Sequence, residues 1–138
     1  MRSSKANDTP IIFVRHGQTD FPSERIYCDG REDPPLNAAG LAQAQRAAEF
    51  LRAAPVVKIY ASPAARTLAT AQAIAATTGA PVETREPLRE RCMGPWDGLT
   101  FADIQTRWPE DFTRWKQDQT AFKLSPGGES MYDVAARV

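Results

Sequence analysis

The sequence predicts an α/β fold with a mostly parallel sheet, and the order of its segments is the main reason. Strand-like segments at 11–14, 56–61 and 81–85 alternate with helical patterns at 37–53 and 63–78. Such alternation is typical of βαβ units, whose strands run parallel. The composition, 42% hydrophobic and 25% charged over 138 residues, fits one domain that buries its own core.

The first strand is expected at Ile11–Val14, a continuous apolar run of the kind found in strands buried on both faces. It ends in Arg15 and in His16, the only histidine of the chain. Open α/β sheets bind ligands at the carboxyl ends of their strands, so these two side chains are expected at the functional edge. The alternative is a surface loop with a structural histidine. A long surface loop, residues 18–35, should follow.

The first helix is expected from Asn37, a capping residue, to about Ala53. Its face towards the sheet should consist of Leu41, Ala44, Ala48 and Leu51. The second helix should begin with Ser62 as N-cap and Pro63 at its first position, and stop at Gly79. Its buried face is expected to comprise Ala64, Leu68, Ala71 and Ala75.

Residues 86–99 lack a period and predict a loop on the active edge. Thr100 and Asp103 form a capping pair for a helix that restarts at Pro109. The aromatic residues of this region recur at helical spacing, which favours a core or a cap over the site rather than a binding surface: Phe101, Trp108, Phe112 and Trp115. A turn at 126–128 should precede a helix at 129–138.

The charge balance excludes a general electrostatic attraction to nucleic acids or anionic membranes, because 17 basic residues face 17 acidic ones. Two cysteines are too few for a disulfide scaffold, and no apolar run is long enough to span a membrane. A reduced, cytoplasmic setting is expected. Residues 1–10 are polar and predict a disordered tail before a domain at 11–138.

Three features should meet at the active edge: Arg15 with His16 after the first strand, Arg66 in the first turn of the second helix, and Glu90 after the third strand. Guanidinium groups and a helix N-terminus bind phosphate through charge-assisted hydrogen bonds, and a histidine between them can attack phosphorus. Alternatively, Arg66 is a solvated helix residue and Glu90 an ion-pair partner of a neighbouring arginine.

The chain resembles the histidine phosphatase superfamily, which includes cofactor-dependent phosphoglycerate mutase and many small phosphatases. The matching motifs occur in family order and cover nearly the whole chain: Arg15-His16-Gly17-Gln18-Thr19, Asp33-Pro34-Pro35-Leu36 with Gly40 and Gln43-Ala44, Ser62-Pro63 with Arg66-Thr67 and Thr70-Ala71, Leu88-Arg89-Glu90 with Gly94, Trp96 and Gly98, and Pro126-Gly127-Gly128-Glu129-Ser130.

The resemblance implies a three-layer α/β/α fold and a metal-independent phosphomonoesterase without a cofactor. By it His16 becomes phosphohistidine, Arg15 and Arg66 bind the phosphoryl oxygens, and Glu90 donates a proton to the leaving group. Thr19 and Arg25 are also expected to contact phosphate. The partner would be a small phosphorylated metabolite, not nucleic acid or membrane, and a homo-oligomer is possible.

The family carries a second histidine on a later strand, and this chain has none. The domain is therefore expected to be incomplete at its C-terminus, with strands missing. Two other functions stay open: a phosphoglycerate mutase, primed by 2,3-bisphosphoglycerate, and an inactive phosphate-binding or interaction domain. The segment 94–98, Gly-Pro-Trp-Asp-Gly, is similar to the phosphatase form of this motif rather than the mutase form. Cysteine-based and Asp-x-Asp phosphatase motifs are absent.

Overall fold

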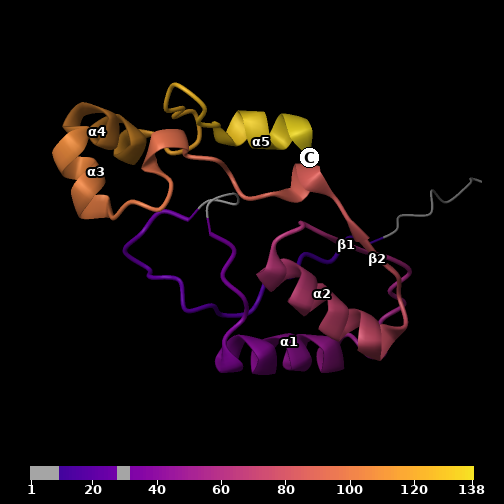
Figure 1. Ribbon diagram of the computed structural model, residues 1–138. Coiled ribbons are helices and arrows are strands. Elements are labelled where there is room, and N and C mark those ends of the chain that lie inside the picture. The colour runs from indigo at the N-terminus through magenta and orange to yellow at the C-terminus, as the bar shows by residue number, and fades with distance from the viewer. Residues whose placement is uncertain (1–9, 28–31) are drawn as a thin grey trace, which may run out of the picture.

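The computed structural model describes residues 10–27 and 32–138. Most of the expected N-terminal tail lies outside these ranges. The elements follow one another as α1 (Ala38–Phe50), β1 (Ile59–Ala61), α2 (Ala65–Thr78), β2 (Val82–Thr84), the 3₁₀ turns η1 (Glu86–Leu88) and η2 (Gly94–Trp96), α3 (Phe101–Arg107), α4 (Pro109–Gln117) and α5 (Met131–Arg137). Figure 1 shows α1 and α2 side by side on one side of the molecule, with α3, α4 and α5 on the other.

The sheet confirms the α/β class and the parallel pairing, although it is small. Within the described residues it has two strands, and Ile59, Tyr60 and Ala61 of β1 pair in parallel with Val82, Glu83 and Thr84 of β2. The crossover between them is α2, as expected for a βαβ unit. Both strands are shorter than predicted. Residues 56–58 stay outside β1, and residues 81 and 85 stay outside β2.

The prediction of a buried strand at 11–14 is wrong for this structure. These residues belong to no helix or strand, and the exposed fractions of Ile11 and Phe13 are 78% and 92%. A strand needs a neighbour for its amide and carbonyl groups, and none of the described residues pairs with this segment. The apolar run therefore leaves its side chains in solvent.

Helix α1 begins as predicted, because the Asn37 side chain accepts a hydrogen bond of 2.8 Å from the Gly40 amide. The helix ends at Phe50, three residues early. Ala48 and Leu51 pack against Ile74 of α2 in a small apolar cluster. Leu41 does not join it: its exposed fraction is 55%, contrary to prediction.

Helix α2 begins later than predicted, because its first residue is Ala65 and not Pro63. The Ser62 hydroxyl hydrogen-bonds to the Thr67 hydroxyl at 2.8 Å instead of capping the helix. The cap comes from a distant part of the chain: the Ala65 amide donates to both carboxylate oxygens of Asp33, at 2.9 and 3.1 Å. The far end is as predicted, with Gly79 in the left-handed conformation at φ 75°.

The second half of the chain contains the larger core. Trp96 and Ile104 are fully buried, and the cluster around them comprises Ile26, Met93, Phe112, Phe122 and Leu124. The Trp96 ring stacks on Phe122 with centroids 5.3 Å apart. The predicted cap pair holds α3, since the Asp103 amide donates to Thr100 Oγ1 at 3.0 Å. Of the aromatic residues predicted as core, Phe112 lies in this cluster and Trp108 and Trp115 pack against it, whereas Phe101 is exposed.

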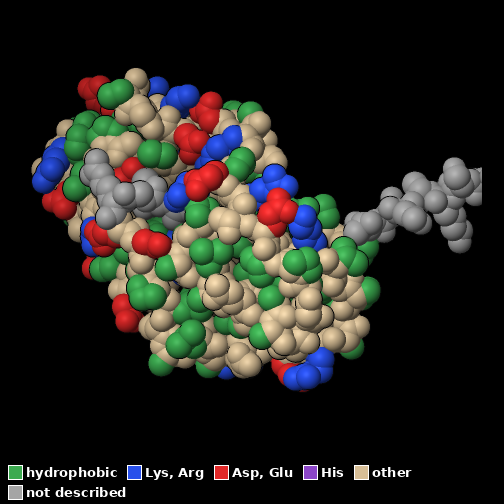
Figure 2. All heavy atoms as spheres, turned by 45° about the vertical axis from the view of Figure 1, so that its right-hand side comes forward, with side chains coloured by type: hydrophobic (Ala, Val, Ile, Leu, Met, Phe, Trp, Pro, Cys, Tyr) green, Lys and Arg blue, Asp and Glu red, His purple; other side chains and the backbone are tan. Residues whose placement is uncertain are grey.

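The two sides of the molecule also differ in their surfaces. On the face shown in Figure 2, charged side chains gather in the upper half, and the lower half, over α1 and α2, is mostly apolar or uncharged. Among residues 10–27 and 32–138, no helix has both the length and the apolar character to span a bilayer.

Candidate functional site

Two segments carry the expected reacting groups: the His16 segment (residues 15–19) and the Glu90 segment (residues 87–92). In the first, Arg15 is exposed and His16 half-buried. Gly17 is buried directly against Gly40 of α1. A Cβ at Gly17 would lie 2.3 Å from the Gly40 carbonyl oxygen, so only glycine permits this approach. The close contact fixes the distance of the His16 segment from α1.

The His16 ring makes a local hydrogen bond that sets its tautomer. Its Nδ1 lies 2.7 Å from the carbonyl oxygen of Gly17. A carbonyl oxygen only accepts, so Nδ1 must carry the hydrogen and Nε2 keeps its lone pair. A neutral imidazole in this tautomer has the chemistry of a nucleophile at Nε2.

Thr70 joins the His16 segment to α2. The Gly17 amide donates to Thr70 Oγ1 at 3.2 Å, and this hydroxyl donates in turn to the Arg66 carbonyl oxygen at 2.9 Å. All three groups belong to buried residues. The structure therefore brings the backbone next to His16 to the turn of α2 that carries Arg66.

The Arg66 side chain is not the solvated helix residue of the alternative interpretation. Its residue is only 4% exposed. The guanidinium lies over the Tyr27 ring, with Cζ 3.9 Å from the centroid, and Nη1 donates to the Tyr27 hydroxyl. Tyr27 in turn contacts Phe21 edge to face at 4.8 Å. The loop before α1 thus covers Arg66 and orients its planar group.

Arg25 and Thr19, the other expected phosphate contacts, have partners within the protein. Arg25 Nε donates to the Gly98 carbonyl oxygen at 2.6 Å, and its guanidinium forms an ion pair with Glu32. Thr19 Oγ1 accepts from the Phe21 amide at 3.3 Å. Both residues shape the loop, and their contact with phosphate stays a prediction.

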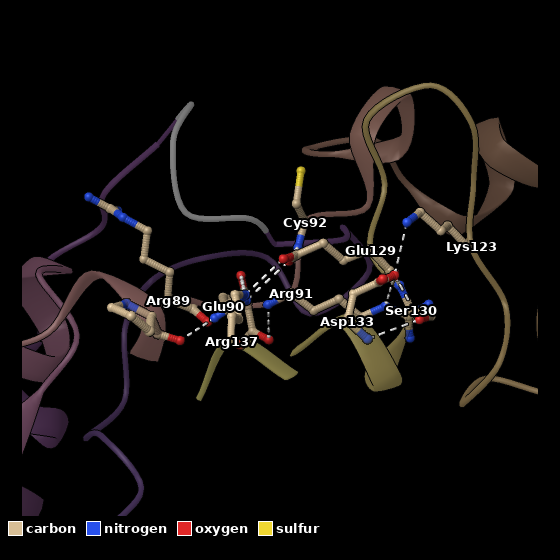
Figure 3. Close-up of polar contacts among 10 residues, drawn as sticks. Arg89, Glu90, Arg91, Cys92, Lys123, Glu129, Ser130, Asp133 and Arg137 are labelled. Atoms are coloured by element: carbon tan, nitrogen blue, oxygen red, sulfur yellow. Dashed lines mark hydrogen bonds and ion pairs between the residues drawn. The ribbon is translucent and has the colours of Figure 1, made fainter. Parts of the chain in front are cut away.

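The Glu90 segment is held from α5. Glu90 is exposed, and its Oε1 accepts from the Arg91 amide at 2.9 Å. Arg137 Nη2 donates to the Glu90 carbonyl oxygen at 3.2 Å and to that of Arg89 at 3.0 Å. Figure 3 shows Arg137 next to Glu90, with the Arg89 side chain pointing away from this cluster. Arg89 forms its ion pair with Glu86, at 2.5 Å.

A second anchor is Arg91, which holds the Glu90 segment to the chain before α5. Its Nε donates to the Glu129 carbonyl oxygen, and its Nη1 and Nη2 donate to those of Gln119 and Phe122, at 2.7, 2.7 and 2.5 Å. Burial lowers the pKa of Arg91, opposed by the carboxylates of Glu129, Asp133 and Glu90. The segment next to the expected proton donor is therefore fixed from both sides.

The carboxylates of Glu129 and Asp133 are held in their charged form. Hydrogen bonds from Arg137, then from the Cys92 amide, lower the pKa of Glu129. Ser130 donates to Asp133 from its amide and its hydroxyl, which, with Lys123, lowers the pKa of Asp133 to about 2. The same Ser130–Asp133 pair is the capping box that starts α5.

Two expectations about ligand contacts can be compared with the geometry. The first amide of α2, expected to face phosphate, is occupied by Asp33, so the positive charge at this place comes from the Arg66 side chain. Within residues 10–27 and 32–138, histidine, cysteine and acidic side chains form no group of three suited to a metal ion.

Tyr27, Thr70 and Arg137 had no functional role in the sequence-based interpretation. Thr70 lies four residues after Arg66, one helical turn away, and that spacing was a usable signal. The Glu129-Ser130 pair directly before the helix predicted at the C-terminal end likewise indicates a helix N-terminus, where polar side chains form hydrogen bonds. Nothing local marks Tyr27, because its contact with Arg66 joins residues 39 positions apart.

Several known proteins with similar sequences are named phosphatases. A glucosyl-3-phosphoglycerate phosphatase of Mycobacterium tuberculosis is 38% identical over 128 residues, 92% of this chain and 56% of that protein. A bifunctional protein of the same organism is 38% identical over 136 residues, 98% of this chain and 36% of its own length. The chain thus spans about a third to about half of these relatives.

Solved structures agree. The native structure of the mycobacterial glucosyl-3-phosphoglycerate phosphatase superposes with a TM-score of 0.77 at 37% identity, covering 88% of this chain and 56% of that one. Its complex with inorganic phosphate gives a TM-score of 0.74, at 37% identity and coverages of 88% and 55%. The profile of the histidine phosphatase superfamily (branch 1) matches residues 11–138. The chain therefore belongs to the histidine phosphatase superfamily.

Proposed function

We propose that the protein carrying this chain hydrolyses small phosphomonoesters through a phosphohistidine at His16. The observation that carries the proposal is the buried Arg66 guanidinium, joined through Thr70 to the backbone beside His16. The hydrogen bonds through Thr70 bring the turn of α2 that carries Arg66 to the backbone beside His16, and a planar guanidinium suits an anion with several oxygens.

In the first step Nε2 of His16 attacks phosphorus, and the bond between phosphorus and the leaving oxygen breaks. The Nδ1–H group supports the developing positive charge by donating to the Gly17 carbonyl oxygen. Arg15 and Arg66 bind the phosphoryl oxygens, which offsets charge repulsion and holds the group in line.

Glu90 protonates the leaving oxygen, so it must itself hold a proton when substrate binds. The negative charge of the bound phosphate raises the affinity of a nearby carboxyl for that proton. In the second step water attacks the phosphohistidine, releases phosphate and restores the ring. Glu90, then ionised, accepts the proton from water.

The relatives support the reaction class. One is named a phosphatase for a phosphoglycerate derivative, and its structure holds inorganic phosphate. The segment 94–98 favours hydrolysis over the mutase alternative, and no metal is required by the mechanism.

The test is phosphate release combined with trapping of the phosphoenzyme from a ³²P-labelled phosphomonoester in metal-free buffer. Wild-type protein should retain acid-labile label, and His16→Gln should retain none. Arg66→Ala should lower kcat/KM by about 10² or more, with Arg66→Lys recovering part of it, because removal of a transition-state hydrogen bond has effects of that order.

Arg114→Ala is the control for Arg66→Ala, since Arg114 is 69% exposed in its ion pair with Asp111. Binding of phosphate without turnover would support an inactive binding domain instead. Isomerisation of phosphoglycerate faster than hydrolysis would support a mutase.

A further inference from the structure

We propose that Glu129 and Arg137 are positioning residues for Glu90, holding the Glu90 segment so that its carboxyl meets the leaving oxygen. The inference rests on the proposed function, in which Glu90 is the proton donor. It adds a role for α5 and for the turn before it, neither of which touches the reacting atoms in that mechanism.

The Glu90 segment has little regular structure to hold it. Residues 89–93 belong to no helix or strand, and only η1 precedes them. The orientation of Glu90 therefore depends on contacts from elsewhere in the fold. General acid catalysis requires the proton within hydrogen-bond distance of the leaving oxygen, so a shift of about 1 Å matters.

Arg137 supplies the contacts on the N-terminal side of Glu90. Its guanidinium donates to the carbonyl oxygens of Pro87, Arg89 and Glu90, the last two from Nη2 at 3.0 and 3.2 Å. A planar group with several diverging N–H donors can bind three carbonyls at once, and the single nitrogen of lysine cannot reproduce that fork.

Glu129 supplies the contacts on the C-terminal side. Its Oε2 accepts from the Cys92 amide at 2.9 Å, and its own amide donates to the Cys92 carbonyl oxygen at 2.8 Å. The carboxylate also binds Arg137 through two hydrogen bonds, to Nε at 2.8 Å and to Nη2 at 3.0 Å. Glu129 and Arg137 thus act as one unit that spans Glu90, as Figure 3 shows.

The contacts of this pair are concentrated on the backbone around Glu90. The side chains of Arg137 and Glu129 are 25% and 24% exposed, and between them they hydrogen-bond to backbone groups of residues 87, 89, 90 and 92. What the pair fixes is the path of the backbone on both sides of one exposed carboxyl group.

The experiment compares two substrates that differ in their need for a proton donor. p-Nitrophenolate leaves as a stable anion, whereas the alkoxide of an alkyl phosphate such as glycerol phosphate must be protonated. Glu90→Gln should therefore lose far more kcat on the alkyl phosphate than on p-nitrophenyl phosphate. Arg137→Gln and Glu129→Gln should show the same selectivity, with about a tenfold larger loss on the alkyl phosphate.

Arg137→Lys should recover little, because it restores the charge but not the fork. The matched controls are Arg52→Gln and Glu49→Gln, which break an exposed ion pair of 2.5 Å at the C-terminal end of α1 and should leave both activities unchanged. A change common to both substrates would report general loss of folded protein.

The decisive comparison is the double variant Glu90→Gln/Arg137→Gln. If Arg137 acts through Glu90, its effect on the alkyl phosphate disappears once Glu90 cannot donate a proton. Additive effects, or equal losses on both substrates, overturn the inference and leave the phosphatase function standing. A wild-type protein without phosphatase activity overturns the proposed function and the inference together.

Discussion

The two segments that carry the expected reacting groups are held in opposite ways. The His16 segment depends on backbone proximity, Gly17 against Gly40, and on two uncharged side chains, since Thr70 Oγ1 accepts from the Gly17 amide and Gln43 Oε1 from the Gln18 amide. The Glu90 segment depends on charged side chains, those of Arg91, Glu129 and Arg137.

The difference shows that one site can position its reacting groups in two ways, by steric contact between backbones and by hydrogen bonds from charged side chains. Steric contact between backbones tolerates almost no substitution, because the atoms that would move are not at the end of a flexible side chain. Hydrogen bonds from long side chains tolerate small rearrangements and respond to pH. Substitutions at Gly17 and at Glu129 therefore test the two kinds of contact separately.

The largest expected effect is on association of the 138-residue chain, because the run before His16 is exposed. Phe13 is 92% exposed and continuous with Ile11 at 78%. Exposed apolar runs with unpaired backbone groups promote self-association. Sedimentation velocity should show oligomers, and Phe13→Ser should shift them towards monomer.

Phe50→Ser is the matched control, since Phe50 is 88% exposed on α1, outside this run. It should leave the distribution unchanged. A monomeric wild-type chain would show that residues 11–14 are covered in solution.

The next effect is that of Gly17→Ala. The added Cβ would lie 2.3 Å from the Gly40 oxygen and 2.8 Å from its carbonyl carbon, so the backbone must separate. Overpacking of this kind destabilises by about 1–3 kcal/mol. Denaturant unfolding should show that loss, and kcat/KM should fall with it, because His16 moves with Gly17.

Gly79→Ala separates steric contact from backbone conformation. Nothing lies within 4 Å of a Cβ there, but φ is +75°, so a loss of about 1 kcal/mol is expected with turnover intact. If both variants retain wild-type activity, the contact between Gly17 and Gly40 does not position His16.

The smallest effect is the pH dependence of stability in Glu129→Gln. The pKa of Glu129 lies below its ordinary value of 4.5 in the folded protein, mainly because of the Arg137 hydrogen bond. The contribution of the ionised Glu129 to the free energy of unfolding is therefore complete above pH 4.5. It is lost as the pH falls through the pKa that Glu129 has in the folded protein. At pH 6 the free energy of unfolding of the wild-type protein should exceed that of Glu129→Gln by up to about 1 kcal/mol.

That difference should narrow below pH 4. Asp133 titrates in both proteins, so it does not contribute to the comparison. Urea unfolding at pH 3, 4 and 6 measures it, and a constant difference across this range would contradict a charge-dependent role of Glu129.

Features with local causes could be predicted from the sequence. Asn37 caps α1, Gly79 ends α2 and Thr100 caps α3, since each depends on residues within one turn. The parallel pairing of β1 with β2 was also predicted, because the length of the intervening helix permits little else.

Features that depend on residues far apart in the sequence could not be predicted from it. The strand at 11–14 was wrong because the pattern shows only that a segment suits a strand, and pairing is decided elsewhere. The start of α2 was wrong because Asp33, 32 residues away, caps it and the Ser62 hydroxyl binds Thr67. Arg66 was singled out, but its burial under Tyr27 carries no local signal.

Thr70 has a consequence for how sequences of this kind can diverge. Its hydroxyl accepts from the Gly17 amide and donates to the Arg66 carbonyl oxygen, and its residue is 5% exposed. Valine has the same shape but would leave the Gly17 amide unpaired, and serine keeps both bonds. Position 70 is therefore expected to tolerate only threonine and serine, although its side chain carries no charge.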